Sequence, residues 1–334
     1  MTESSESPGA TRFRSIKPAR RRFAVLVTNA VFFAFVAHWL WKNVKYADLL
    51  AQVQQIPLSA VFVAMAMNSA VLMLYGLRLG SILRAKPIPC LLITVIGFTF
   101  NSLMPFRIGE GVKIYFGGSY FGLPLGRLGA AVVMEKLYDL SAIVILLALI
   151  GANSDSRIID VGRPTILALA AALVVFGLVI ARLRMTNAVA APSEWAIVKS
   201  LRLDVFARQA ESLLTHQNIA RPAIFTALIW ATNVSLVLVL FKTILPEIHF
   251  GLLDAMTLQA IAALAIAVPA SPAGLGIFEA GIVAYLATIH GVQTERAISA
   301  ALAYHLSITA PHTAIVVVFL GSQIPRLLRA RLRP

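Results

Sequence analysis

Two short stretches place charged residues beside helix breakers inside a very apolar chain. The first, NSLMPFRIGEG at residues 101–111, contains Arg107 and Glu110 next to one proline and two glycines. The second, PASPAGLGIFEAG at residues 269–281, repeats the order Pro, Gly, Glu. A charge at the centre of a bilayer costs roughly 2.5–3.5 kcal/mol, so it is retained where it is paired or faces a wet cavity. Both stretches are therefore candidate parts of a polar site.

The first stretch has the features of an anion-binding turn. Arg107, Glu110 and Lys113 are spaced three apart, which predicts one face of a helix that begins after Pro105. The free amides and partial positive charge at the start of that helix favour a phosphate or a carboxylate. The alternative is a structural ion pair at a membrane edge. The candidate substrate-binding residues here are Asn101, Pro105, Arg107, Gly109, Glu110 and Lys113.

A second charged cluster lies in VVMEKLYDL, where Glu135 and Asp139 are four apart on one predicted helix. Glu135 can pair with Arg107 or Lys113 across the bundle, which makes both acidic residues candidates for the same site. Lys136 points away from them by about 100°, because a helix has 3.6 residues per turn. The alternative places this cluster at the cytoplasmic end of its helix, with Lys136 snorkelling to the interface.

The C-terminal part of the chain adds the remaining candidates. Those of the second stretch are Pro272, Gly274, Gly276 and Glu279. His305 and His312 are seven apart on one helical face, which makes them candidates for a proton relay. The alternative is that both histidines make polar contacts between helices. No carboxylate or cysteine lies near them in the sequence, so we expect no metal site and no cofactor.

The composition indicates the environment of these residues. Hydrophobic residues make up 59% of the chain, charged residues 13%, and the mean hydropathy is +0.82. Such a chain is an integral membrane protein, and its continuous apolar runs predict an all-α fold. Each run is about long enough to cross a hydrocarbon core of roughly 30 Å. The runs lie at residues 23–41, 59–77, 164–181, 223–241 and 297–320.

Basic residues are distributed unevenly between the predicted loops. Lys and Arg number six in residues 1–22, three in 78–89, six in 182–221 and four in 321–334. These 19 contrast with six in the intervening loops, so the richer side is cytoplasmic by the positive-inside rule. We expect a bacterial cytoplasmic (inner) membrane protein with both termini cytoplasmic. The net charge of +14 then reflects anionic lipid headgroups at the cytoplasmic face rather than nucleic acid.

This orientation works only if residues 88–122 enter and leave the membrane on the cytoplasmic side, and residues 252–289 do so from the outside. We therefore predict six full spans plus two broken re-entrant hairpins, arranged as an inverted-repeat bundle. In transporters such breaks form the substrate site near the bilayer midplane. The alternative is eight full spans. The sequence does not indicate an oligomeric state.

The predicted organisation has one membrane domain between two short basic ends. These ends are residues 1–22 and 326–334, and the membrane domain covers residues 23–325. Within that domain, repeat one covers residues 23–153 and repeat two residues 163–320. Residues 193–217 have an amphipathic pattern, which predicts a helix on the cytoplasmic leaflet that acts as a lipid sensor or as a plain loop helix.

Together, NSLMPFRIGEG, VVMEKLYDL and PASPAGLGIFEAG resemble the lysylphosphatidylglycerol synthase transmembrane-region family, over about residues 20–325. In the multiple peptide resistance factor, the related region is a flippase for lipids that a separate synthase domain modifies. The resemblance implies a flippase-type membrane domain here, without that synthase domain. The chain departs from the usual Pro-Gly-Gly pattern by reading Ser-Pro-Ala-Gly at residues 271–274.

The leading functional prediction is a lipid translocator that moves a lipid with a polar, phosphate-containing headgroup between leaflets. The second is an ion-coupled secondary transporter of a small solute, with Glu110, Glu135 or Glu279 as the proton carrier. The third is a membrane-embedded enzyme acting on a lipid headgroup, with Glu110 and Glu135 as acid and base. No phosphate-binding loop, nucleophile elbow or zinc-protease motif occurs in the sequence, so we expect no enzyme.

Overall fold

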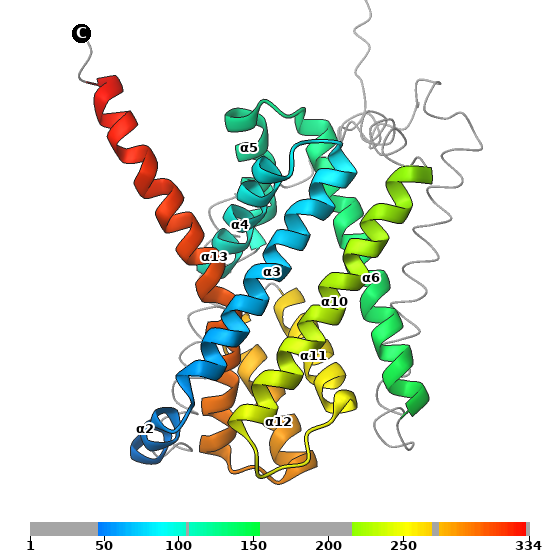
Figure 1. Ribbon diagram of the computed structural model, residues 1–334, viewed down its shortest axis with the longest axis vertical. Helices are drawn as coiled ribbons and strands as arrows, with labels where there is room; N and C mark the ends of the chain where they lie inside the picture. The colour runs from blue at the N-terminus through cyan, green and yellow to red at the C-terminus, as the bar shows by residue number, and fades with distance from the viewer. Residues whose placement is uncertain (1–45, 105–106, 154–215, 269–273, 332–334) are drawn as a thin grey trace, which may run out of the picture. The chain divides into compact units, whose positions relative to one another are not determined.

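The computed structural model describes residues 46–104, 107–153, 216–268 and 274–331, which belong to one compact unit (Figure 1). Every regular element within these ranges is an α-helix, which confirms the predicted all-α class. The helices are α2 (Tyr46–Gln54), α3 (Leu58–Leu83), α4 (Pro87–Leu103), α5 (Gly109–Phe121), α6 (Leu125–Asn153), α10 (His216–Ile244), α11 (Leu252–Ala267), α12 (Ile277–His290) and α13 (Thr294–Arg331).

Three of these helices are long and apolar enough to cross a membrane: α3, α10 and α13. They contain the predicted apolar runs at residues 59–77, 223–241 and 297–320, so these three predictions are confirmed. The other two runs, residues 23–41 and 164–181, lie outside the described residues, as do the N-terminal segment 1–22 and residues 193–215 of the amphipathic pattern. Helix α13 continues through residues 326–331 of the predicted C-terminal tail.

Between the long helices, the chain forms two pairs of short helices, α4 with α5 and α11 with α12, and the members of each pair pack against each other. These helices contain 17, 13, 16 and 14 residues. At 1.5 Å per residue each is about 25 Å long or shorter, less than a hydrocarbon core of roughly 30 Å. The predicted interruptions of residues 88–122 and 252–289 are thus confirmed. In Figure 1 the two pairs lie toward opposite ends of α3 and α10.

Glycines permit the two turns for different reasons. A methyl group at Gly109 would lie 2.0 Å from the carbonyl oxygen of Gly97, so only glycine lets α5 approach α4 this closely. In the second pair, Gly274 and Gly276 have φ of +75° and +88°. L-residues with a Cβ rarely adopt such angles, so glycine is favoured at both positions.

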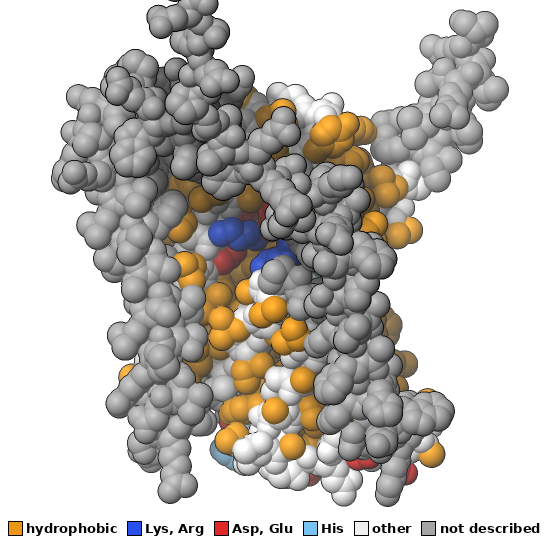
Figure 2. Space-filling view, turned by 180° about the vertical axis from the view of Figure 1, so that it is seen from behind, with side chains coloured by type: hydrophobic (Ala, Val, Ile, Leu, Met, Phe, Trp, Pro, Cys, Tyr) orange, Lys and Arg blue, Asp and Glu red, His pale blue; other side chains and the backbone are white. Residues whose placement is uncertain are grey.

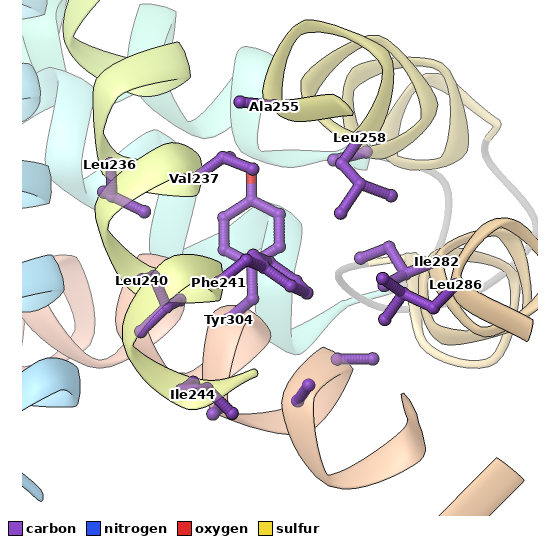
Figure 3. Packing of buried hydrophobic residues seen from close by; sticks show 14 of the residues in the cluster. Leu236, Val237, Leu240, Phe241, Ile244, Ala255, Leu258, Ile282, Leu286 and Tyr304 are labelled. Carbon is purple, nitrogen blue, oxygen red and sulfur yellow. The ribbon is translucent and has the colours of Figure 1, made fainter. Parts of the chain in front are cut away.

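The largest core cluster joins α10, α11, α12 and α13 around Phe241, which is fully buried. The Phe241 ring stacks on Phe250 at 5.4 Å between centroids and meets the Tyr304 ring edge-on at 5.8 Å. Figure 3 shows Leu258 and Ile282 facing this aromatic group from α11 and α12. Lipid tails are as apolar as these side chains, so close packing is what stabilises the cluster in a membrane.

The structure overturns the assignment of Arg78 to a cytoplasmic loop. Helix α3 continues to Leu83, and Arg78 lies within it with only 1% of its surface exposed. The apolar residues that follow Arg78 in LRLGSIL continue the span beyond the charge. Without Arg78, the loops predicted to be cytoplasmic contain 18 basic residues and the other loops contain six. The positive-inside rule therefore still predicts the same orientation.

Candidate functional site

A cavity of about 380 Å³ lies among α3, α4, α6, α10, α11 and α13. Its volume is within the usual range for small-molecule sites. Each interruption contributes a residue to this cavity: Arg107 precedes α5, and Gly274 precedes α12. The predicted site residues that line it are Asn101, Arg107, Asp139, Gly274, His305 and His312.

Beside this cavity, a buried charge network joins α3, α5 and α6. Arg78 donates from both terminal nitrogens to the two oxygens of Asp139, at 2.7 and 3.2 Å. Lys113 Nζ lies 2.5 Å from Glu135 Oε2, which confirms one of the two predicted partners of Glu135. Arg78 Nη2 also lies 3.8 Å from Glu135 Oε1. Buried charges are tolerated when they are paired and hydrogen-bonded. The network therefore explains how an apolar bundle can contain these charged side chains.

The sequence did not predict two charged residues, Arg78 and Lys136, as parts of the site. Arg78 belongs to this network. It is held further by Thr226 Oγ1 at 3.2 Å and by the Tyr75 ring, whose centroid lies 4.8 Å from the guanidinium carbon. Its position between Leu77 and Leu79 was the available signal, because a lone cation inside an apolar run requires a partner.

The second missed residue, Lys136, lines the cavity. Its Nζ lies 2.6 Å from Glu110 Oε1, and the two side chains are 42% and 23% exposed. The pair therefore joins α5 to α6 near the buried pair of Lys113 and Glu135. On the face shown in Figure 2, Lys and Arg side chains gather beside acidic ones, with hydrophobic side chains next to them.

The predicted alignment of Arg107, Glu110 and Lys113 on one helical face is wrong for Arg107, whereas Glu110 and Lys113 do lie three apart on α5. Helix α5 begins at Gly109, and Arg107 has φ of +51°, a left-handed conformation that a right-handed helix excludes. The Arg107 guanidinium instead donates to the carbonyl oxygen of Ala267 at 3.3 Å. Ala267 ends α11, where carbonyl groups lack helical partners and the helix dipole is negative. The two interruptions therefore meet at the cavity.

Among the described residues, the positive and negative charges around this point are unequal in number. The cationic members are Arg78, Arg107, Lys113 and Lys136, and the anionic members are Glu110, Glu135 and Asp139. Each carboxylate has a cationic partner, whereas Arg107 makes no ion pair with any described residue. The cavity is consequently lined by one cation without a carboxylate partner in the described part of the chain.

The starts of α5 and α12 are capped differently. The Gly109 amide donates to Asn101 Oδ1 at 2.8 Å, so the first amide of α5 is not free to bind an anion. The Gly276 amide donates to Glu279 Oε2 at 2.7 Å, and Glu279 thus caps its own helix. Two further predicted residues, Pro105 and Pro272, lie outside the described residues.

The two predicted histidines have distinct environments. His305 Nδ1 lies 2.5 Å from Glu279 Oε1, although no carboxylate is near it in the sequence. His312 Nδ1 lies 3.1 Å from Thr99 Oγ1, and its Nε2 lies 3.5 Å from the Ser102 hydroxyl. Within the described residues, no group of three or more His, Cys, Asp or Glu side chains is arranged to bind a metal.

The apolar helices and the polar cavity between them define a multi-pass α-helical membrane protein with a buried charged site. Residues 23–315 match the lysylphosphatidylglycerol synthase TM region family, and the chain belongs to this family. No curated protein matches the sequence.

Proposed function

We propose that the protein moves a lipid with an anionic, phosphate-containing headgroup between the two leaflets without altering it chemically. The observation that carries this proposal is Arg107, which lines the cavity and makes no ion pair with any described residue. A guanidinium binds phosphate oxygens through two parallel hydrogen bonds, and Lys136 on the same cavity can add a second cation. An arriving phosphate would balance the surplus positive charge.

The family favours a lipid over a free anion, and the cavity volume is compatible with a lipid headgroup. A cavity of about 380 Å³ accommodates a headgroup, while the much larger acyl or isoprenoid chains remain in the bilayer. The family takes its name from the synthase of lysylphosphatidylglycerol, which is a phospholipid. Left-handed backbone at Arg107, which costs about 1–3 kcal/mol, is also of the kind that concentrates at functional sites.

The same proposal includes an inverted-repeat topology in the cytoplasmic membrane of a bacterium, with two re-entrant hairpins. Reporters at Lys86 and Arg127 should then both be cytoplasmic, and tags near Pro246 and Gln293 should both be labelled from outside by an impermeant reagent. The meeting of Arg107 with Ala267 supports this arrangement, because it joins the interruptions of the two halves. Reporters on opposite sides of either pair would replace that hairpin with full spans.

One observation favours a second candidate, an ion-coupled transporter of a small solute. The pair formed by Glu279 and His305 combines two titratable groups, and His305 lines the cavity. Proton movement through this pair would couple a soluble substrate to the proton gradient. The two candidates differ in whether the transported molecule contains lipid chains.

Reconstitution into phospholipid vesicles separates these candidates. We expect the wild type to move fluorescent phosphatidylglycerol between leaflets, and Arg107→Asn to reduce the rate at least about tenfold. Asparagine tolerates the left-handed backbone, so this variant removes the charge without adding strain. Thr243→Ala serves as the control, since Thr243 is exposed on α10 and does not line the cavity.

Thermal unfolding of each variant in detergent shows whether a lost rate reflects misfolding. The lipid-translocator proposal fails if folded Arg107→Asn protein moves lipid at the wild-type rate. It also fails if the wild type moves no lipid but accumulates a soluble anion.

A further inference from the structure

The polar residues of the cavity that lie outside the charge network indicate what else the headgroup contains. We infer that the headgroup carries neutral hydroxyl groups, as a polyol or sugar does, in place of an amine. This inference rests on the proposed function, because it assigns chemistry to the same cavity.

Side-chain amides from three helices line the cavity, and within the described residues each uses only one of its two polar atoms in a hydrogen bond. Asn68 donates to the Ile308 carbonyl at 2.9 Å, which leaves its own carbonyl oxygen as an acceptor. Gln259 accepts from the Tyr304 hydroxyl at 2.8 Å, which leaves its amide nitrogen as a donor. The Asn101 carbonyl oxygen caps α5, so its amide nitrogen is likewise a remaining donor.

Helix α10 adds two groups that the described residues leave without hydrogen bonds. The Asn233 side chain lines the cavity and makes no hydrogen bond within the described part of the chain. The Trp230 indole nitrogen is buried near Asp139 and makes no hydrogen bond with a described residue. Buried N–H groups are nearly always satisfied, so the Trp230 nitrogen is a candidate donor to a bound ligand.

This mixture of donors and acceptors matches a hydroxyl group, which donates one hydrogen bond and accepts two. An ammonium group only donates, and in an apolar bundle it would require a carboxylate. Of the described residues that line the cavity, Asp139 alone carries a carboxylate, and both of its oxygens already accept from Arg78. The Trp230 ring also offers an apolar face for the C–H groups of a polyol or sugar.

The experiment compares labelled lipids with identical chains in vesicles that contain the wild-type protein. The probes are phosphatidylinositol, phosphatidylglycerol, phosphatidylethanolamine and phosphatidic acid, which present hydroxyls, hydroxyls, an amine and a bare phosphate. We expect the two hydroxylated lipids to move at least about tenfold faster than phosphatidylethanolamine. We also expect them to move faster than phosphatidic acid, because the bare phosphate leaves the amides unsatisfied.

Two variants then assign this selectivity to the cavity. Asn233→Ala removes an amide without breaking a described hydrogen bond, and Trp230→Phe removes the N–H while keeping an aromatic ring. Each should lower the rate ratio of phosphatidylinositol to phosphatidic acid, whereas the exposed Thr243→Ala should keep the wild-type ratio. The wild-type ratio decides the inference even if a variant does not fold.

The outcomes separate this inference from the function on which it rests. Faster movement of phosphatidylethanolamine than of the hydroxylated lipids overturns the inference and leaves lipid translocation standing. Movement of no lipid overturns both. Uptake of free glycerol phosphate in preference to inorganic phosphate, without lipid movement, overturns translocation but supports the hydroxyl selectivity of the cavity.

Discussion

The two interrupted segments share the order helix, break, helix, yet they are stabilised in different ways. In the first segment, α4 and α5, Asn101 on one helix caps Gly109 on the other, and Lys113 pairs with Glu135 on α6. In the second segment, α11 and α12, Glu279 caps the start of its own helix and also contacts His305 on α13. The same order of helix, break and helix therefore serves two different purposes.

The charge carried by each segment indicates these purposes. The first segment introduces ion pairs and the surplus cation Arg107, so it supplies the electrostatics of the proposed headgroup site. The second contributes the carbonyl of Ala267, which accepts from Arg107, and the carboxylate of Glu279, which contacts His305. We therefore expect substitutions in the first segment to affect stability and binding, and substitutions in the second to affect protonation.

The largest effect is expected from Lys113→Met. This change leaves Glu135 buried with only the more distant Arg78, and removing one partner of a buried pair costs about 3–5 kcal/mol. The measurement is the free energy of unfolding in detergent. The double variant Lys113→Met with Glu135→Met should recover much of the loss, since an apolar pair of similar volume requires no compensating charge. A single variant as stable as the wild type would mean that the first segment does not depend on α6.

The features that were predicted from the sequence are encoded locally. Proline and glycine mark both interruptions. The pairing of Glu135 with Lys113 is an exception, because it joins two helices; it was predicted because charges in an apolar bundle require partners of opposite sign. The missed features are long-range. Arg78 and Asp139 are 61 residues apart, Glu279 and His305 are 26 apart, and no periodicity relates either pair.

The conformation of Arg107 could not be predicted for a related reason. Its three-residue spacing to Glu110 and Lys113 favoured a continuous helix, and arginine has no preference for left-handed backbone. The contact that accompanies this conformation lies 160 residues away, at the end of α11. A single sequence shows the spacing but not that tertiary contact.

The second prediction compares glycines across the two segments. Gly109→Ala should destabilise by about 3 kcal/mol, at the upper end of the overpacking range, because its Cβ meets the Gly97 carbonyl at 2.0 Å. Gly274→Ala meets only ordinary contacts, the nearest at 3.4 Å, so the left-handed strain of about 1–2 kcal/mol dominates. Gly111→Ala is the control, because nothing lies within 4 Å of its added methyl group. The reverse order would show that left-handed strain at Gly274 costs more than close approach at Gly109.

The third prediction concerns Glu279→Gln, which keeps an oxygen to cap Gly276 but removes the titratable carboxylate. We expect a stability loss of about 1 kcal/mol, the usual contribution of one hydrogen bond. The transport rate of the wild type should change with pH, because Glu279 and His305 can exchange a proton, and the variant, which lacks the carboxylate, should flatten this dependence. If Glu110→Gln flattens it and Glu279→Gln does not, the proton carrier belongs to the first segment.

The smallest effect on stability is expected from Lys136→Gln, and it tests whether burial or proximity decides the strength of a pair. Lys136 with Glu110 and Lys113 with Glu135 both join α5 to α6, at nearly equal distances of 2.6 and 2.5 Å. The first pair is 42% and 23% exposed, whereas the second is 4% and 3% exposed. Exposed pairs contribute about 1 kcal/mol or less, and salt screens them further.

A double-mutant cycle with Glu110→Gln isolates the energy of this pair from other effects of each change. We expect a coupling energy below about 1 kcal/mol that falls with added salt. A salt-independent coupling above about 2 kcal/mol would mean that water does not reach the pair. In that case Lys136 would already be committed to Glu110, and Arg107 would bind an anionic headgroup without a second cation.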